Sequence, residues 1–392
     1  MRVAINGIGV AGPTLAYWLR RLGHEPVLFE KAAALRTGGY LIDFWGLGYE
    51  VAERMGLIPI LRQRCYEMEQ MRMVDGDGRE EARLDLRQMR ELLQGRFISL
   101  ARSDLAAALF GACEGIPAHF GVWISAIDQD SRGVVVTLSD GRQERFDLVI
   151  GAGGLHSGVR ALVFGPQSRF EAPLGCYVAA FRIPDYPHRD ELTYVSYTAP
   201  KRHVGRVALR DGETLVLLVC RSELVDGGPP GEPPPMALRR AFRDMRWEVP
   251  DMLDRMDRAQ DFYSDRVSQI HLPRWSLGRV GLLGDAAACP SLLAGEGTGL
   301  AMAEAYVLAG ELHRAADDFT RAFATYDERL RSFVTAKQKA ALGFRGFFAP
   351  RTAVGLRVRN LMVKAMSIRF VARQLLARSV HDDLQLPEYL AT

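Results

Sequence analysis

Three glycines near the N-terminus have the spacing that lets a backbone bind phosphate. Gly7, Gly9 and Gly12 form a G-x-G-x-x-G pattern, and Glu30 follows about twenty residues later. The first glycine of such a pattern permits a tight turn, the second lets amide N–H groups approach a pyrophosphate, and the third lets a helix pack on a strand. The carboxylate can accept hydrogen bonds from ribose hydroxyls. These residues predict a dinucleotide site.

The elements needed to position these residues are present in the right order. Residues 2–6 suit a short buried strand, residues 13–23 have helical apolar spacing, and residues 26–30 form a second strand that ends at the acid. A glycine pattern alone is weak evidence, whereas this complete order is specific. It does not separate NAD from FAD as the nucleotide.

A second glycine-rich strand end lies in the middle of the chain. The sequence around Asp140-Gly141 predicts a hairpin whose return strand leads into "DLVIGAGGLHSGVR", residues 147–160. The segment "RSDLAAALF", residues 102–110, predicts the start of a helix. The mid-chain glycines are therefore expected to end a strand of the nucleotide-binding sheet.

A third strand end lies late in the chain. A buried strand is expected at 280–283, followed by Asp285, and Gly295, Gly297 and Gly299 open a long helix. A carboxylate at a strand end can hold sugar or ribityl hydroxyls. The N-terminus of a helix offers amide donors to an electron-rich ring oxygen. Both features fit a long dinucleotide that lies across the sheet.

Together the three motifs resemble the FAD-dependent class A aromatic hydroxylases of the para-hydroxybenzoate hydroxylase type. The resemblance covers residues 1 to about 330. The segments "GPTLAYWL", "GDAAACPS" and "LPEYL" are most similar to the flavin monooxygenases that inactivate tetracyclines. The resemblance implies an α/β fold: an FAD-binding Rossmann-like domain of the glutathione reductase type, an inserted, mainly antiparallel β-sheet substrate domain, and a C-terminal helix.

The resemblance also implies which residues bind FAD. The N-terminal glycines and Glu30 would hold the ADP half, and two arginines would contact the flavin side or the phosphates. Asp285 would bind the ribityl chain or the pyrophosphate, and backbone N–H groups of the late glycine motif would stabilise the negative charge of reduced flavin. The implied cofactor-binding set is Gly7, Gly9, Gly12, Glu30, Lys31, Arg36, Arg102, Asp285, Gly295, Gly297 and Thr298.

The chain departs from the family pattern at two positions. The mid-chain motif of the family carries an aspartate where this chain has Gly153, and the late motif carries a second proline where this chain has Leu292. The aspartate serves the family near the FAD and NADPH pyrophosphates. Its loss leaves the use of a nicotinamide cofactor open.

Short strands separated by turn residues between 164 and 265 predict a mainly antiparallel sheet, the expected ceiling of a substrate site. Tyr177, Phe181, Tyr194 and Tyr197 could line this site or form plain core. The expected domains are 1–165 for the first part of the FAD-binding domain, 166–265 for the substrate domain, 266–330 for the return segment of the FAD-binding domain, and 331–392 for a C-terminal helical region.

Other polar residues have two interpretations each. His156 and His203 could act as a general base toward a phenol or could be structural. Asp43 and Trp45 would face the flavin if the resemblance holds. After Leu330 a helix is expected to about Ser379, and residues 340–380 contain no acid. This basic helix could pack across the two domains, which we favour, or lie on an anionic membrane.

Composition excludes several classes of protein. The formal net charge of +3 over 392 residues gives no electrostatic footprint for nucleic acid. The five cysteines are odd in number and never closely paired, which predicts reduced thiols and neither a zinc ribbon nor a disulfide framework. No signal peptide, apolar spanning segment, catalytic triad or metal cluster is visible. We therefore expect a cytoplasmic enzyme without a metal site.

The leading hypothesis is an FAD-dependent monooxygenase with dioxygen as co-substrate and NADPH or NADH as reductant. It would hydroxylate a phenolic, aromatic or polyketide-like molecule, including a tetracycline-like one, through a flavin C4a-hydroperoxide. Gly153 motivates one alternative, a flavin oxidase or dehydrogenase that is reduced directly by its substrate. The other alternative is a flavin-bound protein that sequesters a ligand. The sequence does not predict the oligomeric state.

Overall fold

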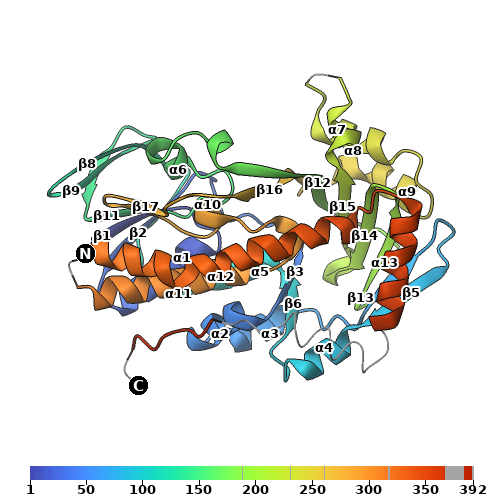
Figure 1. Cartoon of the computed structure of the whole chain (residues 1–392), viewed down its shortest axis with the longest axis horizontal. Coiled ribbons are helices and arrows are strands. Elements are labelled where there is room, and N and C mark those ends of the chain that lie inside the picture. Colours follow the sequence, from blue (N-terminus) through green and yellow to red (C-terminus); the bar gives the residue numbers. More distant parts are fainter. Residues whose placement is uncertain (188, 230, 260, 317, 367–383, 391–392) are drawn as a thin grey trace.

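The structure is a computed structural model that describes residues 1–187, 189–229, 231–259, 261–316, 318–366 and 384–390. Two sheet regions lie toward opposite ends of the molecule, and the long helix α12 (Phe319–Phe348) extends from one toward the other (Figure 1). This arrangement confirms the expected α/β fold with an inserted sheet.

The first region is a six-stranded sheet built around β1 (Arg2–Asn6), whose residues 3–5 are completely buried. Its neighbours β2 (Glu25–Glu30) and β11 (Leu148–Gly151) run parallel to it. The sheet is completed by β18 (Val280–Leu282), β17 (Ser276–Leu277) and β7 (Ala118–Phe120), in the order β17-β18-β11-β1-β2-β7. Because β1, β11 and β18 are parallel, their carboxyl ends meet at one edge of the sheet. The three glycine-rich motifs follow these ends.

The expected hairpin is present but its return strand is divided. Strands β8 (Ile124–Asp130), β9 (Gly133–Leu138) and β10 (Gln143–Phe146) form a separate three-stranded sheet, with Gly141 at a φ of 87° in the turn. Asp147 separates β10 from β11 because its backbone N–H and side chain both bond to Arg2, at 2.8 and 2.6 Å. The chain therefore changes sheets at this residue.

The second region is a seven-stranded sheet in the order β16-β12-β15-β14-β13-β4-β5. All neighbours are antiparallel except β13 and β4, so the expected mainly antiparallel sheet is confirmed. The strands β4 and β5 come from the first part of the chain and were not predicted. The bounds are β16 (Tyr263–Ile270), β12 (Glu171–Ile183), β15 (Thr214–Arg221), β14 (Arg202–Ala208), β13 (Thr193–Ala199), β4 (Gln70–Val74) and β5 (Glu80–Asp85).

Alternate residues of this sheet face two different surroundings, as the two-residue repeat of a strand requires. Val216 and Leu218 of β15 pack with helices α8 (Pro234–Phe242) and α9 (Val249–Arg255). Leu217, between them, packs on the other face with Tyr194 and Tyr40. The helix-covered face is a core, whereas the opposite face is turned toward the nucleotide-binding half of the chain.

The C-terminal region differs from the single helix that was expected. Helix α12 ends at Phe348, and α13 (Ala353–Met366) begins after Pro350. A proline cannot donate the helical hydrogen bond and disfavours helical geometry at the preceding residue, so the helix stops there. The expected continuation beyond 366, with Arg369, Arg373 and Arg378, lies outside the described residues.

The final described segment, 384–390, returns to the nucleotide-binding half. The ring of Tyr389 covers Gly310 of α11 (Gly297–Arg314), where a side-chain carbon would lie 2.2 Å from the ring. The Tyr389 hydroxyl donates to Glu311 at 2.6 Å. Within the described ranges, no helix is both long and apolar enough to cross a membrane. The proposed domain boundaries at 165, 265 and 330 stay a prediction.

Candidate active site

A side chain at each of the three N-terminal glycines would meet different surroundings. Gly7 has a φ of 126°, and a side-chain carbon on it would lie 2.4 Å from the carbonyl oxygen of Ala152. On Gly12, the first helical turn of α1 (Ala11–Arg21), such a carbon would lie 1.9 Å from the carbonyl oxygen of Gly7. On Gly9 it would meet nothing within 4 Å. Two of the glycines are therefore required by packing, and the third borders open space.

Glu30 points back at this glycine loop. Its Oε2 accepts a hydrogen bond of 2.8 Å from the amide of Ile8, and its Oε1 accepts one of 2.9 Å from Ala32. The two basic residues of the predicted set that follow Glu30 are at the surface. Lys31 is exposed, with its ammonium 5.2 Å from the centre of the Trp123 ring, and Arg36 is exposed on the segment after β2.

The charges of two arginines act on Asp285. It is the first residue of α10 (Asp285–Ala288), which begins shortly after β18 ends at Leu282. Burial raises the pKa of its carboxyl, and the positive charges of Arg102 and Arg160 oppose that rise. Arg102 begins α5 (Arg102–Gly111), and Arg160 is almost completely buried with a hydrogen bond of 3.2 Å to Ala286. The structure thus brings two residues of the predicted set together with a third polar group that was not in it.

The late glycines adjoin the same carboxylate. A side-chain carbon on Gly297, the first residue of α11, would lie 3.6 Å from Oδ1 of Asp285. Gly295 turns the chain before the helix with a φ of 70°. Gly299 packs directly on Gly48 of α2 (Gly46–Arg54), where a side-chain carbon would lie 2.4 Å from the Gly299 Cα. Small residues at these positions let the two helix ends approach closely.

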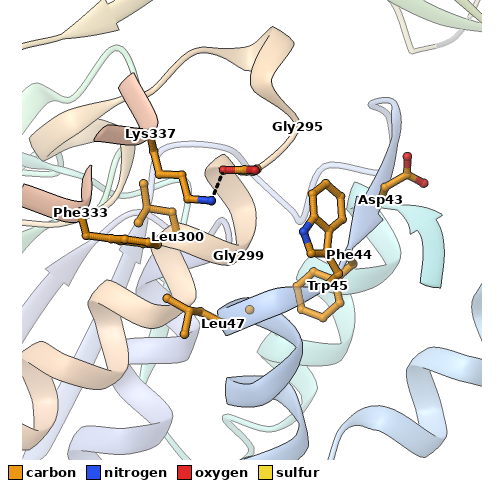
Figure 2. Close-up of a pocket in the computed structure, with 11 residues that line it drawn as sticks. Asp43, Phe44, Trp45, Leu47, Gly295, Gly299, Leu300, Phe333 and Lys337 are labelled. Carbon is orange, nitrogen blue, oxygen red and sulfur yellow. Dashed lines mark ion pairs between the residues drawn. The ribbon is translucent and has the colours of Figure 1, made fainter. Parts of the chain in front are cut away.

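A pocket opens beside the N-terminus of α11. Figure 2 shows Lys337 and Phe333 of α12 on one side and Trp45 on the other. It is lined by Asp43, Phe44, Trp45, Leu47, Gly48, Gly295, Glu296, Gly299, Leu300, Phe333 and Lys337. Asp43 and Trp45, singled out from the sequence, therefore border the late glycine motif.

Asp43 is held at the end of β3 (Leu41–Phe44). Its carboxylate accepts a short hydrogen bond from the hydroxyl of Ser99, which belongs to β6 (Ile98–Ala101). Asp43 is an exposed residue at the border of the pocket. Desolvation by the protein atoms around it raises the pKa of its carboxyl, and the Ser99 hydrogen bond opposes the rise.

The mid-chain motif ends β11 at the same sheet edge. Gly153 is exposed, and a side-chain carbon there would meet its nearest atom, the Ser157 Cα, at 3.5 Å. That distance is ordinary van der Waals contact. A side-chain Cβ atom therefore fits at this position, so crowding at that atom does not explain the absence of the family's aspartate.

The two histidines lie in different surroundings. His156 is 61% exposed and bonds to Asp265 at 2.8 Å, which raises its pKa. His203 is buried on β14, and desolvation lowers its pKa to about 3. Both His203 ring nitrogens are engaged, one with Thr198 and one with Tyr194, each at 2.8 Å. These contacts favour the structural interpretation of His203.

Two functional candidates escaped the sequence analysis. Glu304 is a lone acid in the apolar run "LAMAEAYVL" of α11, and its Oε2 accepts from the Gly284 amide at 2.7 Å. The ion pair of Lys337 with Glu296, at 2.8 Å, joins residues far apart in sequence. The lone acid in an apolar helix could have been recognised from the sequence. The ion pair could not, because its two residues are far apart in the chain. In the described part of the chain, no cluster of acids, histidines or cysteines is suited to a metal.

Comparison with known proteins defines the class. The FAD binding domain family matches residues 1–339, and the chain belongs to this family of class A flavin-dependent monooxygenases. A flavin-dependent monooxygenase of Legionella longbeachae is 33% identical over 403 residues, covering 99% of this chain and 98% of the relative. One from an unknown prokaryotic organism is 33% identical over 395 residues, covering 99% of both chains.

Solved structures give the same result. The crystal structure of the tetracycline destructase Tet(51) superimposes with a TM-score of 0.84 at 32% identity, covering 99% of both chains. A structure of Klebsiella pneumoniae HpxO with FAD and uric acid has a TM-score of 0.79 at 20% identity, covering 96% of both chains, and supports the fold alone. The chain is a flavin-dependent monooxygenase by these relationships, and FAD is its cofactor.

Proposed function

We propose that this protein uses NADPH or NADH, FAD and dioxygen to hydroxylate a phenolic, aromatic or polyketide-like small molecule. The likeness to Tet(51) supports a tetracycline-like member of that class. The observation that carries the proposal is the meeting of the Gly7–Gly12 loop, Asp285 and the α11 N-terminus at one sheet edge, beside a second sheet. An interface between two such halves is where a small-molecule site is expected.

The residues present fit FAD. Open space at Gly9 allows a pyrophosphate to approach the backbone, and Glu30 stands at the same loop for ribose hydroxyls. Asp285 and Arg102 would hold the ribityl chain and the phosphates. The N–H groups at Gly295, Gly297 and Thr298 would face the pyrimidine edge of the ring, where the positive end of α11 favours negative charge. Lys31 and Arg36 would contribute at the rim, because both are exposed.

When bound, FAD supplies the acceptance of electrons, the activation of dioxygen and the transfer of one oxygen atom. The protein has to orient the substrate and to exclude water from the reacting centre. The apolar face of the second sheet, with Ala180, Leu217 and Val219, is suited to excluding water. Tyr194 packs on the same face, and its hydroxyl is engaged by the buried His203 at 2.8 Å.

Anaerobic reduction of the flavin tests this function. FAD-loaded protein is mixed with NADPH and, separately, with NADH, and the oxidised-flavin absorbance is followed with and without a panel of phenols and a tetracycline. We expect bleaching by a nicotinamide that one class of compound accelerates. Bleaching by a compound alone, without nicotinamide, would instead favour a substrate-reduced oxidase, the function that Gly153 suggests. No bleaching under any condition with FAD bound would favour a ligand-sequestering protein.

A further inference from the structure

One charge pair stands at the helix terminus where the flavin is proposed to bind. Nζ of Lys337, from α12, lies 2.8 Å from Oε2 of Glu296, the residue immediately before α11. Both side chains are mostly buried, at 18% and 23% exposure. The ammonium also lies 5.3 Å from the centre of the Phe333 ring. Figure 2 shows Lys337, from which the dashed line of this ion pair starts, on the opposite side of the pocket from Trp45.

The two charges act on the helix terminus with opposite signs. The N-terminus of α11 carries a partial positive charge, which a nearby anion offsets. Glu296 places a full negative charge there, and Lys337 compensates for it. Because both groups are mostly shielded from solvent, salt screens their fields less than at an exposed surface. Asp43 is the other ionisable group that lines the pocket in the described residues.

We propose that Lys337 and Glu296 set the reduction potential of the bound FAD, the lysine raising it and the glutamate lowering it. This inference rests on the placement of the flavin ring given in the proposed function. Two-electron reduction of FAD with uptake of one proton leaves one additional negative charge on the ring. A neighbouring cation stabilises that charge and a neighbouring anion destabilises it. Lys337 and Glu296 are thus positioning residues whose charges act through space.

The experiment measures the reduction potential of three variants. Lys337→Met, Glu296→Gln and the double variant are loaded with FAD and reduced anaerobically by xanthine and xanthine oxidase against a reference dye. We expect Lys337→Met to shift the ratio of reduced to oxidised flavin about tenfold toward oxidised, which is about 30 mV for a two-electron couple. Glu296→Gln should shift it in the opposite direction. The double variant should return close to the wild-type potential.

A control variant removes the lysine of a charge pair that does not line the pocket. Lys201, in the turn between β13 and β14, pairs with Glu223 at 2.6 Å, and both side chains are more exposed, at 40% and 49%. Lys201→Met should leave the potential unchanged. The dissociation constant of FAD and the unfolding temperature are measured for every variant, and Lys337→Gln replaces the methionine variant if that one does not fold. A purely structural pair would weaken FAD binding in both single variants without shifts of opposite sign.

Shifts of the same sign, or unchanged potentials with FAD bound, would overturn the inference. These outcomes are distinct from a failure of the proposed function. In that case the wild-type protein would bind FAD but produce no hydroxylated product, whatever its potential.

Discussion

Glu304 supports the Gly284 turn from inside the molecule. Its Oε2 accepts a hydrogen bond of 2.7 Å from the Gly284 amide, and the side chain is completely buried. The Tyr326 hydroxyl approaches the same oxygen at 3.2 Å, while Oε1 has no hydrogen-bond partner among the described residues. The turn precedes Asp285, so this buried acid fixes the backbone that presents a proposed FAD ligand.

Glu304 should make the stability of the protein depend on pH. Burial raises its pKa from the ordinary 4.5 to about 8, so the folded chain holds a proton between these values that the unfolded chain releases. The free energy of unfolding therefore falls as pH rises through this window. Glu304→Gln keeps an oxygen for the Gly284 amide and removes the titration. One pKa unit corresponds to ~1.4 kcal/mol. We therefore expect the free energy of unfolding of Glu304→Gln, relative to that of the wild type, to be a few kcal/mol higher at pH 9 than at pH 5. Denaturant unfolding of both proteins at the two pH values measures this difference, and parallel pH profiles would refute it.

Gly9 and Gly12 should respond differently to alanine. Gly12→Ala forces a side-chain carbon against the Gly7 carbonyl and should cost at least 2 kcal/mol of stability. Gly9→Ala meets no protein atom within 4 Å, so the chain should fold normally but bind FAD at least tenfold more weakly. Thermal unfolding without FAD and fluorescence titration with FAD separate the two effects. Unchanged FAD affinity in Gly9→Ala would place the pyrophosphate elsewhere.

Gly153 should accept an aspartate without loss of stability. The position is exposed, and a side-chain carbon makes only ordinary contact with Ser157. We expect the free energy of unfolding of Gly153→Asp to stay within about 0.5 kcal/mol of the wild type. Denaturant unfolding checks this, with Gly7→Asp as the disruptive comparison. A loss of several kcal/mol at Gly153 would mean that packing, rather than function, excludes the carboxylate.

Thr198 should be important for the stability of the substrate sheet. Its hydroxyl oxygen accepts a hydrogen bond of 2.9 Å from Arg359 of α13 and lies 2.8 Å from Nδ1 of His203. All three side chains are buried. Thr198→Val leaves two buried polar groups without this partner, at a cost of about 2–4 kcal/mol. Thr198→Ser should cost less than about 1 kcal/mol because the hydroxyl remains. Because the pKa of His203 is about 3, the difference between the variants should be the same at pH 6 and pH 8. Equal stability of the two variants would show that the Thr198 hydroxyl does not stabilise the fold.

The sequence predicted what depends on local pattern. Strand β1, helix α1 and the turn at Gly141 follow from hydrophobic periodicity and glycine geometry, and all are present. The pairing of β4 with β13 could not be predicted. Parallel pairing between residues 70–74 and 193–197 leaves no signal in the local sequence. The break at Pro350 was predictable in principle, since proline interrupts a helix, but the apolar spacing around it continues.

The same distinction holds for the site. The glycines, Glu30 and Asp285 could be predicted because the spacing of each motif has a physical reason. The approach of Arg160 to Asp285 and of Lys337 to Glu296 depends on how α6 (Gly158–Val163) and α12 fold back on the sheet. Such contacts are set by tertiary packing, so only the structure shows them.

The fate of the oxygen atoms separates a monooxygenase from an oxidase. The FAD-loaded protein is given NADPH under ¹⁸O₂ with a tetracycline and with a panel of phenols, and the products are weighed by mass spectrometry. We expect one substrate to gain a single ¹⁸O atom for each dioxygen consumed, with the second atom released as labelled water. A substrate that is oxidised without gaining ¹⁸O, with dioxygen converted to hydrogen peroxide, would contradict this expectation.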